Sequence, residues 1–146
     1  MNAFHQSNRR GVLGTIAVAV ISLAACSGMP YGNQFRVTLS GDQEVPAVKT
    51  SASGGGTITI NADKTVSGSV TTTGLAGTMA HIHIAAVGKN GPVIVPLTKS
   101  GDGAWSVPAG AKLTDAQYDA YKVGDLYVNV HSAENKGGEI RGQLKP

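Results

Sequence analysis

The chain has 146 residues, of which 41% are hydrophobic, 14% are charged and only 5% are aromatic, and its formal net charge is +3. Two of its twelve basic residues, Arg9 and Arg10, lie in a predicted N-terminal signal, which leaves ten basic residues against nine acidic ones. The basic residues do not cluster with aromatic residues, so we expect no nucleic-acid partner. Without the signal, the chain has the length of one small domain of about 115 residues.

The first 25 residues have the layout of a secretory signal. Arg9 and Arg10 precede an apolar run over residues 11–25, which is short for a membrane-spanning helix. The run ends in Leu-Ala-Ala-Cys (23–26), which resembles a bacterial lipobox, where the cysteine is acylated and becomes the first residue. We therefore expect removal of residues 1–25 and lipidation of Cys26. An uncleaved anchor helix, or a plain signal cut elsewhere, is the alternative.

The residues after the cleavage site predict where the protein resides. Ser27 is not the aspartate that usually retains a lipoprotein at the inner membrane. We therefore expect a protein anchored in the cell envelope, at the outer membrane and facing the periplasm or the surface if the host is Gram-negative. Residues 26–33 form a short tether, and residues 34–146 form the domain. Cys26 is the only cysteine, so the domain contains no disulfide.

Short β-strands dominate the predicted domain. They are rich in β-branched residues, and glycine, proline and asparagine separate them. Residues 61–64 (NADK) supply a turn between two such strands and predict a hairpin. About eight strands are expected, over residues 34–40, 56–60, 65–73, 79–84, 92–98, 103–107, 126–131 and 139–144.

One helix interrupts this pattern. Thr114 is a suitable N-cap, Gln117 stands at capping-box spacing, and Gly124 is a stop signal. Many short strands must pair and bury one face to give a stable domain. We therefore predict an all-β, Greek-key β-sandwich or barrel with one short helix.

The histidines of the predicted domain lie on two of these strands. His81 and His83 point to one face of their strand, together with Met79, because residues two apart share a face. His131 shares a face with Tyr127 and Asn129. Neighbouring strands would bring the three imidazoles together as ligands for copper or zinc, with Met79 as a weaker soft ligand. Ordinary polar positions on an exposed sheet face are the alternative.

The sequence gives less support to nucleophilic catalysis or phosphate binding. No cysteine remains in the domain to act as a nucleophile, and no serine lies in a strand–turn–helix elbow. The glycine-rich residues 51–56 lack the Lys-Ser/Thr ending of a phosphate-binding loop and are expected to form a flexible loop. In the segment EVPAV (44–48), Glu44 is expected to cap or pair beside a strand, or to belong to a binding loop.

Three blocks in order resemble a CHRD domain, a module known from chordin and from secreted bacterial proteins of unassigned role. The blocks are LSGDQEVPAVKTSASG (39–54), AHIHIAAVGKNGPVIVPL (80–97) and GDLYVNVHSAENKGGEIRGQL (124–144). The resemblance covers about residues 34–145. It implies a family but no defined activity.

A more distant similarity links the histidine segments to copper/zinc superoxide dismutases, and the expected fold is superoxide dismutase-like or immunoglobulin-like. The similarity implies His81, His83 and His131 as copper ligands and Arg141 as a residue that guides the anion. Arg141 could instead be an edge-strand cation paired with Glu139 or another surface acid. The chain lacks the bridging histidine and the disulfide of those enzymes.

The preferred interpretation is a lipid-anchored, non-catalytic binding module with a copper site, or a zinc site as second choice. A superoxide dismutase-like enzyme, and a structural or adhesive envelope module without metal, are the alternatives. The identity of any protein or polymer partner stays open.

Overall fold

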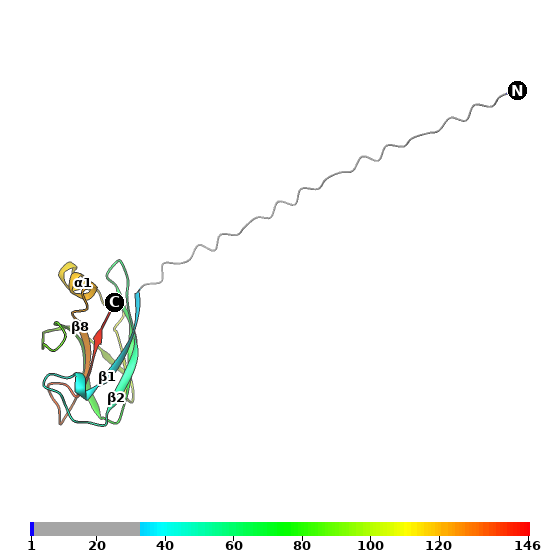
Figure 1. Ribbon diagram of the computed structural model, residues 1–146. Coiled ribbons are helices and arrows are strands. Elements are labelled where there is room, and N and C mark those ends of the chain that lie inside the picture. The colour runs from blue at the N-terminus through cyan, green and yellow to red at the C-terminus, as the bar shows by residue number, and fades with distance from the viewer. Residues whose placement is uncertain (2–32) are drawn as a thin grey trace.

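A computed structural model describes Met1 and residues 33–146 (Figure 1). The predicted signal, Cys26 and nearly all of the predicted tether lie outside the described residues. Among the residues described, no helix has the length and apolar character needed to cross a membrane.

Nine strands and one α-helix make up the domain, which confirms the predicted all-β class with one short helix. The strands are β1 (Asn33–Ser40), β2 (Ser53–Ile60), β3 (Val66–Thr73), β4 (Gly77–Ile84), β5 (Val93–Pro96), β6 (Thr98–Gly101), β7 (Ala104–Ser106), β8 (Leu126–Ser132) and β9 (Ile140–Leu144). The α-helix is α1 (Asp115–Lys122), and a short 3-10 helix, η1 (Gly41–Gln43), follows β1.

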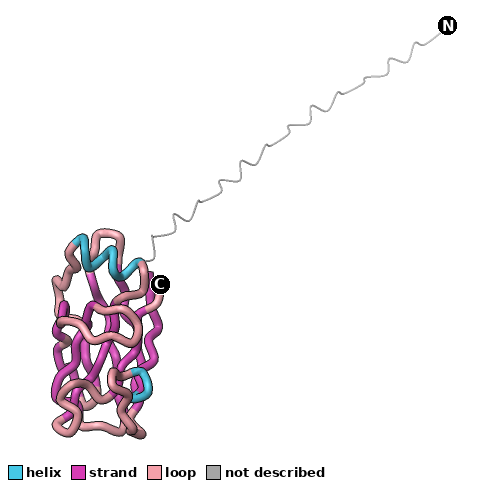
Figure 2. Tube along the Cα trace, turned by 60° about the vertical axis from the view of Figure 1, so that its left-hand side comes forward, coloured by secondary structure: helices cyan, strands magenta, loops and turns pink. Residues whose placement is uncertain are grey.

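The strands form one antiparallel sheet in the order β5-β4-β8-β9-β1-β2-β3-β7-β6, curved into a nearly closed barrel (Figures 1 and 2). The two edge strands, β5 and β6, follow each other in the chain and are separated by Leu97 alone. The backbone N–H of Leu97 donates to the carbonyl of Ala80 at 2.9 Å. The chain therefore leaves one edge of the sheet and enters the other within a single residue, which brings the two edges together.

Alternating apolar residues fill the barrel. On β1, Phe35, Val37 and Leu39 are buried while the residues between them are exposed, as period-two alternation requires. The predicted 61–64 hairpin is present: β2 and β3 pair along their whole length, and Lys64 N–H donates to the Asn61 carbonyl at 2.9 Å.

Helix α1 packs at one end of the barrel (Figure 2). Its predicted capping box is present, because the Thr114 hydroxyl accepts from the Gln117 N–H and the Gln117 side chain accepts from the Thr114 N–H. Gly124 follows at φ +82°, the conformation expected of a glycine stop signal. The helix buries Tyr121, whose ring meets Phe35 edge-on at a centroid distance of 5.2 Å.

Candidate metal centre

The three histidines come from two neighbouring strands. β4 pairs with β8 in antiparallel register, with Met79 opposite His131, His81 opposite Asn129 and His83 opposite Tyr127. Residues opposite each other in such a pair project to the same face of the sheet. Ala80 and Ile82, which alternate with the histidines along β4, belong to the hydrophobic core instead. The strand alternation of β4 and β8 therefore places all three imidazoles on one face.

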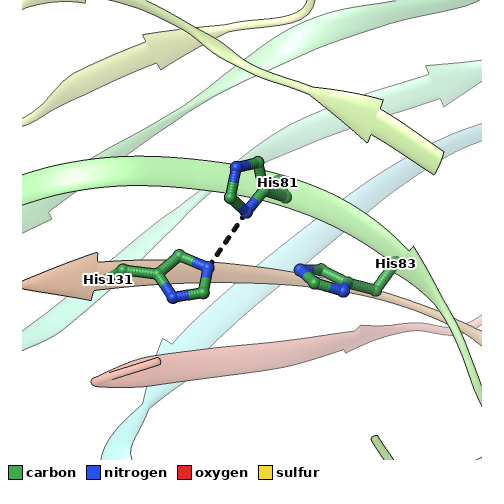
Figure 3. A group of neighbouring side chains, drawn as sticks. All are labelled: His81, His83 and His131. Carbon is green, nitrogen blue, oxygen red and sulfur yellow. Dashed lines mark hydrogen bonds between the residues drawn. The ribbon is translucent and has the colours of Figure 1, made fainter. Parts of the chain in front are cut away.

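The three rings converge on one point (Figure 3). One nitrogen from each histidine can be chosen so that the three atoms all lie within 4.8 Å of one another. His81 Nδ1 and His131 Nε2 are 3.0 Å apart and share a hydrogen bond. The predicted convergence is confirmed, and three nitrogens at these separations could bind a single ion with metal–nitrogen bonds near 2 Å.

Two backbone carbonyls orient the rings from behind. His83 Nδ1 donates to the carbonyl of Gly91, and His131 Nδ1 donates to the carbonyl of Lys136, both at 2.9 Å. In the neutral rings, the Nε2 atoms of both residues therefore carry lone pairs. His83 Nε2 is buried, and no group of residues 33–146 meets the geometry of a hydrogen bond to it, although the Asn129 side chain is close enough to act on the ring. Metal-binding histidines commonly donate their second N–H to a carbonyl in this way, which fixes the tautomer.

Burial favours the ligating form of the rings. Burial, and to a lesser extent the neighbouring His131 and His83 rings, together lower the pKa of His81 to about 4. Burial also lowers the pKa of His83, although its hydrogen bond to the Gly91 carbonyl opposes this. Because metals bind the unprotonated ring, neither residue has to lose a proton to bind a metal at neutral pH.

The part of the histidine face that lies on β8 is buried and is not the exposed sheet face of the alternative interpretation. Every residue of β8 is buried, and Tyr127, Asn129 and His131 are each 6% exposed or less. Carbonyls of two loops, residues 85–92 and 133–139, accept hydrogen bonds from side chains of the histidine face. A third loop, residues 41–52, is joined to the first by the hydrogen bond from Asn90 to the Val45 carbonyl. Sequence alternation separates the two faces of a strand but does not show which loops cover the outer one.

Met79 stands at the exposed end of this face. It is opposite His131 in the strand register, and half of its surface is exposed. Its part in metal binding stays a prediction.

The family model for the CHRD domain matches residues 35–144. The chain belongs to the CHRD domain family. The comparison with curated proteins gave no match, and neither did the comparison with solved structures. The likeness of this CHRD domain to superoxide dismutases stays a prediction.

Arg141 is buried in this CHRD domain rather than exposed. Its side chain is 1% exposed, and its guanidinium carbon lies 3.4 Å from the centroid of the Tyr127 ring. It donates to the side-chain oxygens of Asn90 at 3.2 Å and Gln143 at 3.3 Å. The alternative of an edge-strand cation paired with Glu139 or another surface acid is wrong. β9 lies between β8 and β1, and Arg141 is buried and makes no ion pair with any acid of the described residues.

Tyr127 connects Arg141 to the histidines. Its ring stacks on that of His83 with a centroid distance of 4.7 Å and an interplanar angle of 7°. Its hydroxyl accepts from the backbone N–H of Gly91, whose carbonyl holds His83. The sequence predicted that Tyr127 lies on the histidine face. Its contacts with Arg141 and His83 could not be predicted, because they depend on the register of β4, β8 and β9.

Glu44 also lies near the histidine face, and its buried position could not be predicted from the sequence. It is 6% exposed, its Oε1 atom has no hydrogen-bond partner, and it lies against Gly138 beside Asn129. Burial raises the pKa of Glu44, although the Val45 N–H and Arg141 oppose the change. The segment EVPAV was noted as a loop, but no local pattern connects it to a strand some eighty residues later.

Proposed function

We propose that this CHRD domain is a non-catalytic module of the cell envelope that holds a copper ion, with zinc as the second choice, at His81, His83 and His131. The observation that carries the proposal is the convergence of three imidazole nitrogens within 4.8 Å. The buried Nε2 of His83 adds to it, because this atom loses its solvation and no group of residues 33–146 forms a well-aligned hydrogen bond with it. A metal ion would supply the missing partner.

A metal ion would replace the proton that His81 and His131 share. In the neutral rings, the Nδ1–H group of His81 donates to Nε2 of His131. For Nδ1 of His81 to bind the metal, its proton has to move to Nε2 of the same ring. This change of tautomer leaves the ring neutral, so it does not make binding at that ring compete with protons.

The proposed role is binding rather than turnover for two reasons. The chain has three histidines outside the predicted signal, and all three are used as candidate ligands, so none remains to bridge a second metal. Arg141 lies under Tyr127 and is 1% exposed, which gives an incoming anion little access to its charge. Superoxide turnover above that of free copper would overturn the non-catalytic assignment.

Metal analysis tests the site directly. The full chain with Cys26→Ser, which lacks the competing thiol, is loaded with copper or zinc and separated from free metal. We expect one ion per chain, and at least about a 10-fold loss of affinity in His81→Ala, His83→Ala and His131→Ala alike. Lys99→Ala, on the exposed strand β6, is the matched control and should bind as the parent does.

Retention of less than one ion per chain would favour a structural or adhesive module without metal. An effect confined to one histidine would also contradict a shared site.

The envelope location rests on the predicted signal and on CHRD family membership, which fits a small binding domain of the envelope. We propose that a lipid on Cys26 anchors the domain to the membrane, with residues 26–33 as the tether. Mass spectrometry of the N-terminal peptide should find an acylated cysteine. Cys26→Ser should move the protein from the membrane fraction to the soluble fraction, and its retention in the membrane would contradict a lipid anchor.

A further inference from the structure

The buried charge of Arg141 lies close to the proposed metal centre. Its guanidinium carbon is 3.4 Å from the centroid of Tyr127, and that centroid is 4.7 Å from the centroid of His83. The charge is therefore within about 8 Å of an imidazole that would bind the metal. No solvent separates the two groups, because the Tyr127 ring fills the space between them and is 2% exposed.

Within the described chain, no carboxylate forms an ion pair with this guanidinium; the ion pairs there are Lys64–Asp115 and Lys122–Asp119. Arg141 instead donates to two neutral amide oxygens and lies over an aromatic face. Glu44 is the acid that acts on Arg141 electrostatically, and its burial disfavours its charged form. No ion pair within residues 33–146 therefore neutralises the positive charge beside the site.

The donor set carries no negative charge of its own. The three clustered donors are histidines, and no carboxylate is grouped with them. Each added positive charge on a bound ion is repelled by Arg141. The ion would lie slightly beyond the His83 ring, at about 8–10 Å from the guanidinium, where an effective dielectric constant of 20 weakens binding about 15- to 30-fold per charge. A monovalent ion is affected less than a divalent one.

The exposed side of the site offers a soft ligand. Met79 is opposite His131 on the same face, where paired residues have Cβ atoms about 4.5–5.5 Å apart. Its unbranched side chain has three rotatable bonds, and half of its surface is in solvent, so it is free to turn towards the histidines. Thioether sulfur prefers Cu⁺ among the ions that histidine binds.

We infer that the three-histidine site selects monovalent copper over divalent metal ions, with Arg141 disfavouring the divalent ions and Met79 favouring Cu⁺. This inference rests on the proposed function and specifies its ligand. The Irving–Williams order does not oppose it, because that order ranks divalent ions against one another.

The test compares affinities for Cu⁺, Cu²⁺ and Zn²⁺ in the full chain with Cys26→Ser, with Cu⁺ measured without oxygen against a chromogenic Cu⁺ chelator. We expect binding of Cu⁺ at least about 100-fold tighter than binding of Zn²⁺. Arg141→Met removes the charge and keeps an apolar side chain against Tyr127. It should raise the affinity for Zn²⁺ and Cu²⁺ about 10- to 30-fold relative to Cu⁺. Arg141→Lys keeps the charge and should leave the ratio unchanged.

Met79→Leu is the second variant, and it keeps the size of the exposed side chain. It should weaken Cu⁺ binding about 10-fold and leave Zn²⁺ binding unchanged. Zn²⁺ bound as tightly as Cu⁺, or a ratio that Arg141→Met does not change, would overturn the selectivity while leaving the metal site intact. Failure of every ion to bind would instead overturn the proposed function.

Discussion

Gly138 shows how one residue makes room for buried polar side chains. A Cβ atom at this position would lie 2.3 Å from Glu44 Oε1 and 2.6 Å from Asn129 Nδ2, and the backbone has φ +132°. Both the contacts and the dihedral disfavour any other residue. We expect Gly138→Ala to lower the free energy of unfolding by about 2–4 kcal/mol, measured by urea denaturation.

The adjacent glycine is the control for this substitution. A Cβ atom at Gly137 would have no neighbour within 4 Å, so Gly137→Ala should change stability by less than about 0.5 kcal/mol. Equal effects of the two substitutions would contradict a specific role for the space at Gly138.

The lowered pKa of His81 leads to a prediction of how the stability of the metal-free domain depends on pH. That pKa is lowered to about 4 by burial and by the neighbouring imidazoles, from an ordinary value near 6.5. Between these two values the unfolded chain binds a proton at His81 that the folded chain does not, so stability falls as the pH decreases from about 6.5 to about 4. The lowered pKa of His83 acts in the same direction.

The measurement is the free energy of unfolding of the metal-free protein at several pH values. His81→Asn removes one titrating group, so its stability should fall less steeply over that interval than that of the parent chain. Parallel pH curves for the two proteins would contradict the lowered pKa of His81.

At the scale of elements, α1 could be predicted in detail because its signals are local. Thr114, Gln117 and Gly124 act within a few residues of the helix ends and do not depend on the rest of the fold. The strand predicted over residues 92–98 shows the opposite case, because it is divided into β5 and β6. Leu97 marks the change of partner from β4 to β7, and that change follows from barrel closure rather than from local pattern.

The capping box gives a prediction for the helix. Thr114→Ala removes the oxygen that accepts from the Gln117 N–H, so it should cost about 1 kcal/mol in thermal or urea unfolding. Thr114→Ser keeps that oxygen and should restore most of the loss. Asp119→Ala removes an exposed ion pair with Lys122 and should have almost no effect. A loss of similar size in Asp119→Ala would contradict the assignment of the effect to the cap.

For the whole molecule, the sequence predicted the convergence of the histidines but not their surroundings. Period-two alternation puts His81 and His83 on one face, and the register of β4 and β8 then brings His131 to them. The stacking of Arg141 on Tyr127, and the approach of Glu44 to Asn129, join segments far apart in the chain. Contacts of this kind depend on how the loops fold over the barrel, which no local sequence pattern encodes.

The proposed metal site exists only in the folded state, because its parts come from separate strands and loops. The donors come from β4 and β8, and the carbonyls of Gly91 and Lys136 that orient them come from two loops. In an unfolded chain, His81 and His83 stay close in sequence, but His131 is no longer held beside them and the rings are not oriented. A metal that binds the folded state alone stabilises it, by about 2.7 kcal/mol when the free metal is at 100 times its dissociation constant.

We therefore expect buffered copper to raise the unfolding midpoint of the Cys26→Ser chain in proportion to the logarithm of free metal. His131→Ala separates this linkage from non-specific binding, since it leaves the His81–His83 pair intact but removes the ligand from β8. Its midpoint should be nearly independent of copper. A copper-dependent rise of equal size in His131→Ala would mean that the ion binds elsewhere, because only a site built across β4 and β8 requires both strands to be in place.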